Sequence, residues 1–271
     1  MMNITPVVKQ LLILNIIFFI GSQMVPIANS YFALHYFENP MFKLWQPLSH
    51  MFMHSNLLHI FFNMFALFSF GSALESFWGG KKFLFFYISC GLGAALLHTV
   101  FDYFQLQNIL SSVSDLNLSH DLLNKVLSVK FDDGIVYRSD FFEDAIKPIL
   151  IENNKWNLIN EDNFRTLFQA AIQFDSKAVG ASGAVYGLLV AFAFMFPKAE
   201  LMMMFIPIPI KAKYFVPGLL LLDLFLGLKG SSFFAAGSTG VGHFAHIGGA
   251  ITGFIMMWFW KKNQFNHRRW N

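Results

Sequence analysis

The sequence predicts an all-α polytopic membrane protein with six transmembrane helices and a long extracytoplasmic insertion between helices three and four. Three observations lead to this fold class. Hydrophobic residues make up 55% of the 271 residues and charged residues only 13%, well below the roughly 25% of soluble domains. Several apolar runs approach or exceed the ~20 residues that a helix needs to cross a bilayer. Residues 104–176, in contrast, hold eleven acids against six bases and no run of spanning length.

The first three apolar runs cover about residues 7–26, 55–77 and 83–101. Small residues at Ala28-Asn29-Ser30 would also fit a signal peptide, but an uncleaved anchor is preferred, and cleavage would move only the N-terminus. The mixed, aromatic residues 27–53 predict an extramembrane or interfacial loop. The single cysteine, Cys90, excludes an intramolecular disulfide.

The predicted insertion divides the chain into residues 1–103 with helices one to three, residues 104–176, and residues 177–271 with helices four to six. Within the insertion, the segment DNFRTLFQAAIQF from Asp162 predicts a short amphipathic helix with an Asp or Asn cap. Asp133-Gly134 predicts the turn of a hairpin.

The last three apolar runs cover about residues 180–196, 214–228 and 242–260. Between the fourth and fifth, Pro207 and Pro209 exclude a regular helix, so we expect a loop along the membrane interface. Trp258 and Trp260 are typical of an aromatic belt.

The basic residues of the short connections predict the orientation, since they are enriched on the cytoplasmic side. One side holds ten Lys and Arg residues, and the other, without the insertion and Lys177 at its end, only Lys43 and Lys229. Both termini are therefore expected in the cytoplasm and the insertion outside. The ten are Lys9, Lys81, Lys82, Lys198, Lys211, Lys213, Lys261, Lys262, Arg268 and Arg269.

The fourth run opens with residues 180–187, GASGAVYG. Ser182 is the only hydroxyl of its first turn, and Tyr186 lies four residues later on the same helical face. Gly183 and Gly187 have the spacing that lets membrane helices approach closely. Taken by itself, this octapeptide fits either helix packing or catalysis, and packing is preferred because small residues are common at membrane helix interfaces.

Polar residues gather near the starts of segments two, four and six, which all run inward from the outer face in this orientation. Ser182 lies about 7 to 8 Å below Lys177 at the outer edge. Because polar groups at membrane depth are costly, such a layer indicates function. Its members are His54, His59, Asn63, Ser182, Tyr186, His243 and His246.

The residue types in this layer fit nucleophilic catalysis. Gly249 and Gly253 repeat the close-packing spacing in segment six, and two glycine-faced helices would bring Ser182 and His246 within hydrogen-bond reach. A serine is a weak nucleophile unless a neighbouring imidazole takes its proton.

The other polar groups suit supporting roles in the same reaction. His59 and Asn63, spaced i, i+4, together with the backbone N–H of Ser182, would hold a developing oxyanion. Tyr186 would stack on the His246 ring. The alternative for Asn63 is a bridge between helices.

Two further sets of residues have competing interpretations. His50 and His54 have i, i+4 spacing, but without HExxH or a nearby carboxylate no metal is expected there. Asp223, in segment five near the depth of Ser182, would be either a third member of a catalytic triad or a structural hydrogen-bond partner. The structural role is preferred, since buried membrane acids often pair locally.

Three short motifs resemble those of the rhomboid family of intramembrane serine proteases. GASG at 180–183 is similar to the family's GxSG nucleophile motif, and His59-x-x-x-Asn63 to its second-segment motif. Ala245-His246-x-x-Gly249-x-x-x-Gly253 is similar to its sixth-segment motif. The resemblance covers everything except the insertion and implies a six-helix bundle with a Ser182–His246 dyad and no catalytic acid. The glycines expected to serve helix packing are Gly180, Gly183, Gly187, Gly249 and Gly253.

The resemblance also implies the setting of the reaction. Substrates would be transmembrane proteins cut in the bilayer, the enzyme a multi-pass protein of the bacterial inner membrane, with no cofactor, metal or nucleic acid. No oligomeric state is predicted. The chain departs from the family in two respects. It lacks the Trp-Arg pair often found in the family's first loop, where Trp45-Gln46 is the most similar pair, and it has a 73-residue insertion before Ser182.

Two other functions are alternatives to proteolysis. A non-catalytic rhomboid-like protein would bind or sort membrane clients, and such relatives typically lack the serine or the histidine that this chain keeps. A transporter would require inverted repeats and a polar path at the midplane, and the sequence has neither.

Overall fold

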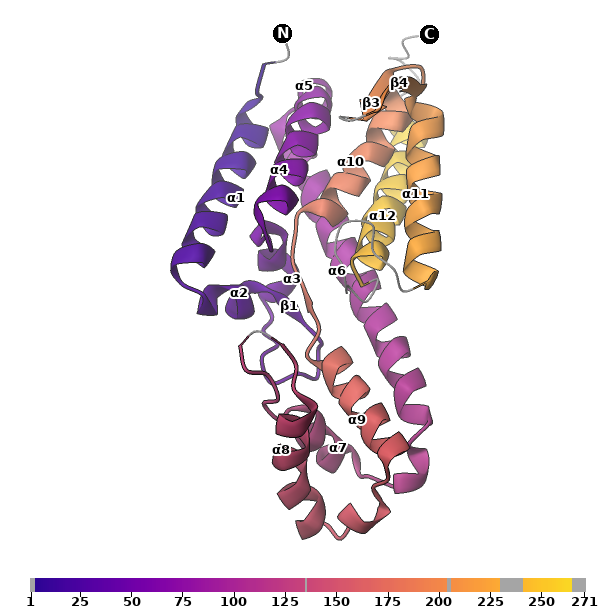
Figure 1. Cartoon of the computed structure of the whole chain (residues 1–271). Coiled ribbons are helices and arrows are strands. Elements are labelled where there is room, and N and C mark those ends of the chain that lie inside the picture. The colour runs from indigo at the N-terminus through magenta and orange to yellow at the C-terminus, as the bar shows by residue number, and fades with distance from the viewer. Residues whose placement is uncertain (1–2, 135, 204–205, 230–240, 265–271) are drawn as a thin grey trace. The chain divides into compact units, whose positions relative to one another are not determined.

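The computed structural model describes residues 3–134, 136–203, 206–229 and 241–264, and these residues are mostly helical (Figure 1). The chain forms two compact units. The first comprises Met1–Leu34, Leu44–His98 and Ala178–Asn271, and the second comprises His35–Lys43 and Thr99–Lys177.

Each of the six predicted apolar runs is helical. Within the described residues, Pro6–Met24, Leu57–Trp78 and Gly80–Ser111 are long and apolar enough to cross a membrane. The count of six spans stays a prediction. The helices of these runs are α1 (Pro6–Met24), α4 (Leu57–Ala66) continued by the π-helical turn η2 (Leu67–Gly71) and α5 (Ser72–Trp78), α6 (Gly80–Ser111), α10 (Ser182–Met195), α11 (Ala212–Lys229) and α12 (Val241–Gln264).

Helix α6 extends further than the third apolar run. The sequence placed the end of this segment near residue 101 and the start of the insertion at residue 104, whereas the helix continues to Ser111. Its last turns carry apolar side chains that join the core of the second unit, with Leu106 buried there and Ile109 and Leu110 packed against it. Burial of these side chains accounts for the added turns.

Glycines bring α10 into backbone contact with α12 and side-chain contact with α6. A Cβ on Gly249 would lie 1.8 Å from the carbonyl oxygen of Gly183, and one on Gly253 would lie 2.9 Å from the Cα of Gly187. On the α6 side, a Cβ on Gly183 would lie 2.3 Å from the Cβ of Ala94. The expected packing of α10 against α12 is therefore present, and α6 packs against the same glycines.

The segment after α10 is not the loop that its prolines led us to expect. Strands β3 (Glu200–Met203) and β4 (Ile206–Lys211) pair antiparallel, with Glu200 opposite Lys211. The prediction of a loop was wrong because both strands of a two-stranded sheet are edge strands. On the outer side of an edge strand, a proline without an N–H takes no hydrogen bond from a neighbouring strand.

Residues 27–53 hold short elements rather than one extended loop. They are α2 (Ile27–Phe32), β1 (Leu34–His35), α3 (Gln46–Ser49) and the 3₁₀ turn η1 (His50–Phe52). The side chains of Trp45 and Gln46 both donate to the carbonyl oxygen of Tyr31, at 3.4 and 3.2 Å. This contact ties the start of α3 to the end of α2.

The second unit has a core of its own, made by amphipathic helices. Buried residues include Phe142, Ile146, Leu167 and Phe174. The predicted amphipathic helix is present as α9, with a capping box between Asn160 and Asn163. The elements are η3 (Ser114–Leu116), α7 (His120–Leu127), α8 (Ser139–Glu152), η4 (Trp156–Leu158), α9 (Glu161–Phe174) and β2 (Lys177–Ala178), which pairs with β1.

Around the predicted turn at Asp133-Gly134, the described residues on the two sides pair with each other. Asp132 and Tyr137 form an isolated antiparallel bridge, and Gly134 has a φ of +87°. The Gly134 N–H donates to the Asp132 carboxylate at 2.9 Å, which closes the turn locally.

Candidate active site

Ser182 is the first residue of α10, directly after a constrained loop. Gly180 has a φ of +126°, and its N–H donates to the carbonyl oxygen of His50 at 2.9 Å. A Cβ on Gly180 would lie 2.7 Å from His59 Nε2. Gly180 was expected among the helix-packing glycines, but it precedes the helix and instead makes room for the His59 ring.

The side chains of Ser182 and His246 lie in hydrogen-bond contact. The Oγ of Ser182 is 2.8 Å from Nε2 of His246. His246 lies on α12 one turn before Gly249, whose contact with Gly183 brings the two helices together. The glycine contact therefore positions the two polar side chains.

Tyr186 lies one helical turn after Ser182 and stacks on the His246 ring. The ring centroids are 4.2 Å apart and the planes are inclined by 9°. Such a parallel contact restricts rotation of the imidazole, so that its two nitrogens stay directed at fixed partners.

His59 lies next to Ser182, and Asn63 lies one turn further along α4. A Cβ on Gly180 would lie 2.7 Å from His59 Nε2 and 3.6 Å from Ser182 Oγ, so both side chains lie close to Gly180. On its other side, His59 Nδ1 is 3.1 Å from the Ser55 hydroxyl. The Asn63 amide donates to the His59 carbonyl oxygen at 2.9 Å, and an amide has a second N–H that this bond does not use.

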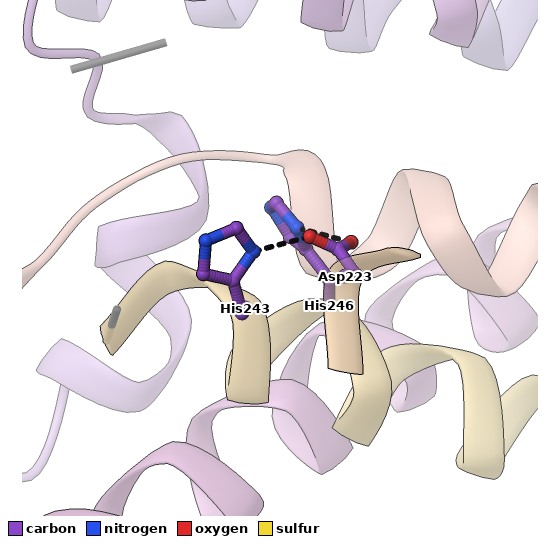
Figure 2. Close-up of side chains that lie close together, drawn as sticks. All are labelled: Asp223, His243 and His246. Atoms are coloured by element: carbon purple, nitrogen blue, oxygen red, sulfur yellow. Dashed lines mark hydrogen bonds and ion pairs between the residues drawn. The ribbon is translucent and has the colours of Figure 1, made fainter. Parts of the chain in front are cut away.

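Asp223 lies between two histidines of α12 (Figure 2). Its Oδ2 is 3.0 Å from Nδ1 of His246, and its Oδ1 is in short contact with Nδ1 of His243. The Tyr186 hydroxyl also bonds to this carboxylate. The sequence left Asp223 as either a third triad member or a structural hydrogen-bond partner, with the structural role preferred, and the contact with His246 is known only from the structure.

The sequence does hold one indication of this contact, namely Gly227, four residues after Asp223. A Cβ on Gly227 would lie 3.0 Å from the Cβ of His243, so α11 approaches α12 closely at this turn. The pair Asp223-x-x-x-Gly227 thus places the carboxylate on the side of α11 that faces α12.

Asp223, His243 and His246 could also offer ligands to a metal ion, because one ligand atom from each lies within 4.8 Å of the others. His50 and His54, the pair considered from spacing, have other surroundings. His50 Nδ1 is 3.0 Å from the Gln46 carbonyl oxygen, and burial lowers the pKa of His50 to about 4. The ring of His54 lies edge-on to that of His59, with centroids 5.0 Å apart.

Comparison with known proteins agrees with the motifs. The family model described as the rhomboid domain matches residues 41–107 and 163–263, together more than half of the chain. Rhomboid protease AarA of Providencia stuartii is 39% identical over 64 residues, which cover 24% of this chain and 23% of that protein. With its long apolar helices, the chain is an integral membrane protein. On the extent of the domain match, it belongs to the rhomboid family.

Proposed function

We propose that the protein is an intramembrane serine endopeptidase that cleaves transmembrane segments of membrane proteins. The observation that carries this proposal is the 2.8 Å contact between Ser182 Oγ and His246 Nε2 on two helices held together by glycines. Membership in the rhomboid family and the partial similarity to a rhomboid protease support the same reaction class.

In the proposed reaction, Ser182 Oγ attacks the carbonyl carbon of the scissile peptide bond and its proton passes to His246 Nε2. The imidazolium then donates that proton to the leaving amine, which gives an acyl-enzyme. A water molecule next loses a proton to His246 and attacks the ester carbonyl. Collapse of this second intermediate releases the carboxylate product and returns the proton to Ser182.

The negative oxygen of each tetrahedral intermediate needs donors beside Ser182. The backbone N–H of Ser182 has no partner within α10, because it belongs to the first turn. His59 Nε2 and Ser182 Oγ both lie close to Gly180, and the second N–H of Asn63 is a further candidate. These groups are proposed to form the oxyanion site, which typically contributes about 10² to 10³ in kcat per donor.

Substrates are proposed to be transmembrane helices that unwind easily. A helix hides its peptide carbonyls in its own hydrogen bonds, so helix-breaking residues near the cleavage site are expected to favour cleavage. No cofactor takes part in the proposed steps.

The test uses the purified protein in proteoliposomes with a transmembrane substrate. Ser182→Ala and His246→Ala are each expected to abolish cleavage, while the matched exposed variants Ser111→Ala and His120→Ala keep it. A fluorophosphonate probe is expected to label wild type and not Ser182→Ala. Cleavage by Ser182→Ala would refute the proposal, and a folded wild type with neither cleavage nor labelling would favour the non-catalytic, client-binding alternative.

We further propose that both termini face the cytoplasm and that residues 104–176 form an extracytoplasmic insertion, in a bacterial inner membrane. The uneven distribution of Lys and Arg supports this orientation. In a Cys90→Ser background, Glu152→Cys is expected to react with a membrane-impermeant maleimide in intact cells, whereas Asn3→Cys reacts only after lysis. The reverse pattern would refute this orientation.

A further inference from the structure

Asp223 is a buried carboxylate in a helix that is otherwise almost entirely apolar. Its exposed fraction is 6%, and it lies in α11 where this helix packs against α12. A charge in such surroundings is costly unless several donors meet it, so its partners indicate what it does.

Among the residues that the structure describes, three donors reach the two carboxylate oxygens. The Nδ1–H groups of His246 and His243 donate to Oδ2 and Oδ1 respectively, and the hydroxyl of Tyr186 donates to the same carboxylate. Tyr186 also stacks on the His246 ring. The ring of His246 is therefore held both at its face and at one nitrogen by groups that are bonded to each other.

We infer that Asp223 is the positioning residue of the reaction, so that the site operates as a Ser182–His246–Asp223 triad, with His243 and Tyr186 holding the carboxylate. This inference rests on the proposed function and goes beyond the two-residue dyad. It also revises our expectation from sequence, which favoured a purely structural role for Asp223.

The chemical reason lies in the tautomer of His246. An ionised carboxylate is an acceptor only, so the proton of the neutral ring stays on Nδ1 and the lone pair of Nε2 faces Ser182. When Nε2 takes the serine proton, Asp223 stabilises the imidazolium without becoming protonated. The Nδ1 proton remains in place throughout, and only the Nε2 proton moves between serine, leaving amine and water.

A metal ion at the same three residues would have the opposite effect. An ion bound to His246 Nδ1 would leave the ring proton on Nε2, which then could not accept a proton from Ser182. The 2.8 Å contact between Nε2 and the serine hydroxyl is what a base needs, and both imidazoles complement the carboxylate as donors. The trio therefore fits hydrogen bonding better than metal binding.

The test separates the effect of the charge of the Asp223 side chain on kcat from the effect of its shape. Asp223→Asn keeps the shape and removes the charge, and it is expected to lower kcat by at least about 100-fold with KM changed less than about threefold. Asp223→Glu keeps the charge with a longer side chain and is expected to retain more activity than Asp223→Asn. A structural role would give the reverse order, because asparagine fits the space better.

The matched control is Asp102→Asn. Asp102 is also buried in a helix, but its carboxylate accepts from Gln173 and Ser176 at 3.2 and 3.4 Å. This variant is expected to lower the thermal stability in detergent while kcat stays within about threefold of wild type. Asp223→Asn with a kcat as high as that of Asp102→Asn would overturn the inference.

Two further measurements complete the design. In Asp223→Ala, added formate is expected to raise kcat. This measurement replaces the asparagine comparison if Asp223→Asn does not fold. A kcat that does not change with formate would overturn the inference. Loss of wild-type activity with a zinc chelator, restored by Zn²⁺, would also overturn it. If Ser182→Ala cleaved as well as wild type, the proposed function would fail instead, so the two failures are distinguishable.

Discussion

Two groups of helices in this protein, one in each unit, pack in different ways. In the first unit, α10 and α12 touch backbone to backbone, with Gly249 directly against the carbonyl of Gly183. In the second unit, helices α7, α8 and α9 meet through large side chains, among them Phe142, Leu167 and Phe174.

The difference follows from the surroundings that suit the helices, which are lipid for the apolar sequences of α10 and α12 and water for the charged sequence of α7, α8 and α9. Lipid tails are as apolar as leucine, so membrane helices gain little from burying large side chains and associate through close contact of small ones. Residues 104–176 are rich in charge and amphipathic, and such helices gain free energy by burying one apolar face away from water. Catalysis is proposed at the glycine contact of α10 with α12, because close helix approach brings short polar side chains into contact.

The largest expected effect is that of a side chain at the glycine contact. Gly249→Val would place a Cβ 1.8 Å from the Gly183 carbonyl oxygen, and this backbone atom cannot turn away. The two helices must separate, so cleavage and fluorophosphonate labelling are both expected to fall by more than about 100-fold.

Gly218→Ala is the matched control, since a Cβ on Gly218 would meet nothing within 4 Å. It is expected to be neutral, or to stabilise α11 by up to about 1 kcal/mol. Equal activity of Gly249→Val and Gly218→Ala would show that the helix contact does not position the site.

The second prediction concerns the core of the other unit. Phe142 is fully buried, with its ring 5.5 Å from that of Phe131 and 5.4 Å from that of Phe168. Phe142→Ala is expected to destabilise this unit by about 3–5 kcal/mol, measured as faster limited proteolysis within residues 104–176. Labelling of Ser182 by the probe is expected to persist.

The neighbouring Phe141→Ala serves as the control, because this ring is exposed. Its expected cost is below about 0.5 kcal/mol. Loss of Ser182 labelling in Phe142→Ala, but not in Phe141→Ala, would mean that the site depends on the fold of the second unit.

A pH effect of intermediate size is expected from His50, whose carbonyl holds Gly180 in place. Burial lowers the pKa of His50 from 6.5 to about 4 in the folded protein. As the pH falls, the unfolded chain therefore binds a proton at His50 at a higher pH than the folded protein does. The contribution of His50 to the free energy of unfolding is complete above pH 6.5 and is lost as the pH falls from there through about 4. The total loss is about 3 kcal/mol.

Thermal unfolding in detergent between pH 7 and pH 4 measures this loss. His50→Gln removes the titrating group, so its unfolding temperature is expected to depend less on pH than that of wild type over this range. Identical pH dependence in the two proteins would exclude His50 as the cause.

The smallest expected effect is at the cap of α9. The Asn160 side chain accepts from the N–H of Asn163, and the Asn163 side chain accepts from the N–H of Asn160. Asn160→Ala is expected to cost about 1 kcal/mol, read as faster amide exchange in the first turn of α9. Asn160→Asp keeps an acceptor at the cap and is expected to restore slow exchange, and equal exchange in both variants would contradict the capping role.

Much of the architecture could be predicted from apolar runs and charge. The helical character of all six runs, the amphipathic α9 and the contact of α10 with α12 were predictable because they depend on composition and spacing. The pairing of β3 with β4 was not, since Pro207 and Pro209 argue against a strand until the partner is known. The length of α6 depended on a core that forms from distant residues.

The sequence by itself determined the residue types near the site and their order along the chain, namely a serine, an imidazole and close-packing glycines at related depths. Only the tertiary structure decided that Asp223 bonds to His246, and that Gly180 serves the His59 ring rather than a helix contact. The physical reason is that apolar residues cover every face of α11, so its hydrophobic periodicity indicates no face, and the spacing of Asp223 and Gly227 marks a side of the helix without naming the residue that it meets. Hydrogen bonds depend on positions within a few tenths of an ångström, and these arise only when the helices are packed.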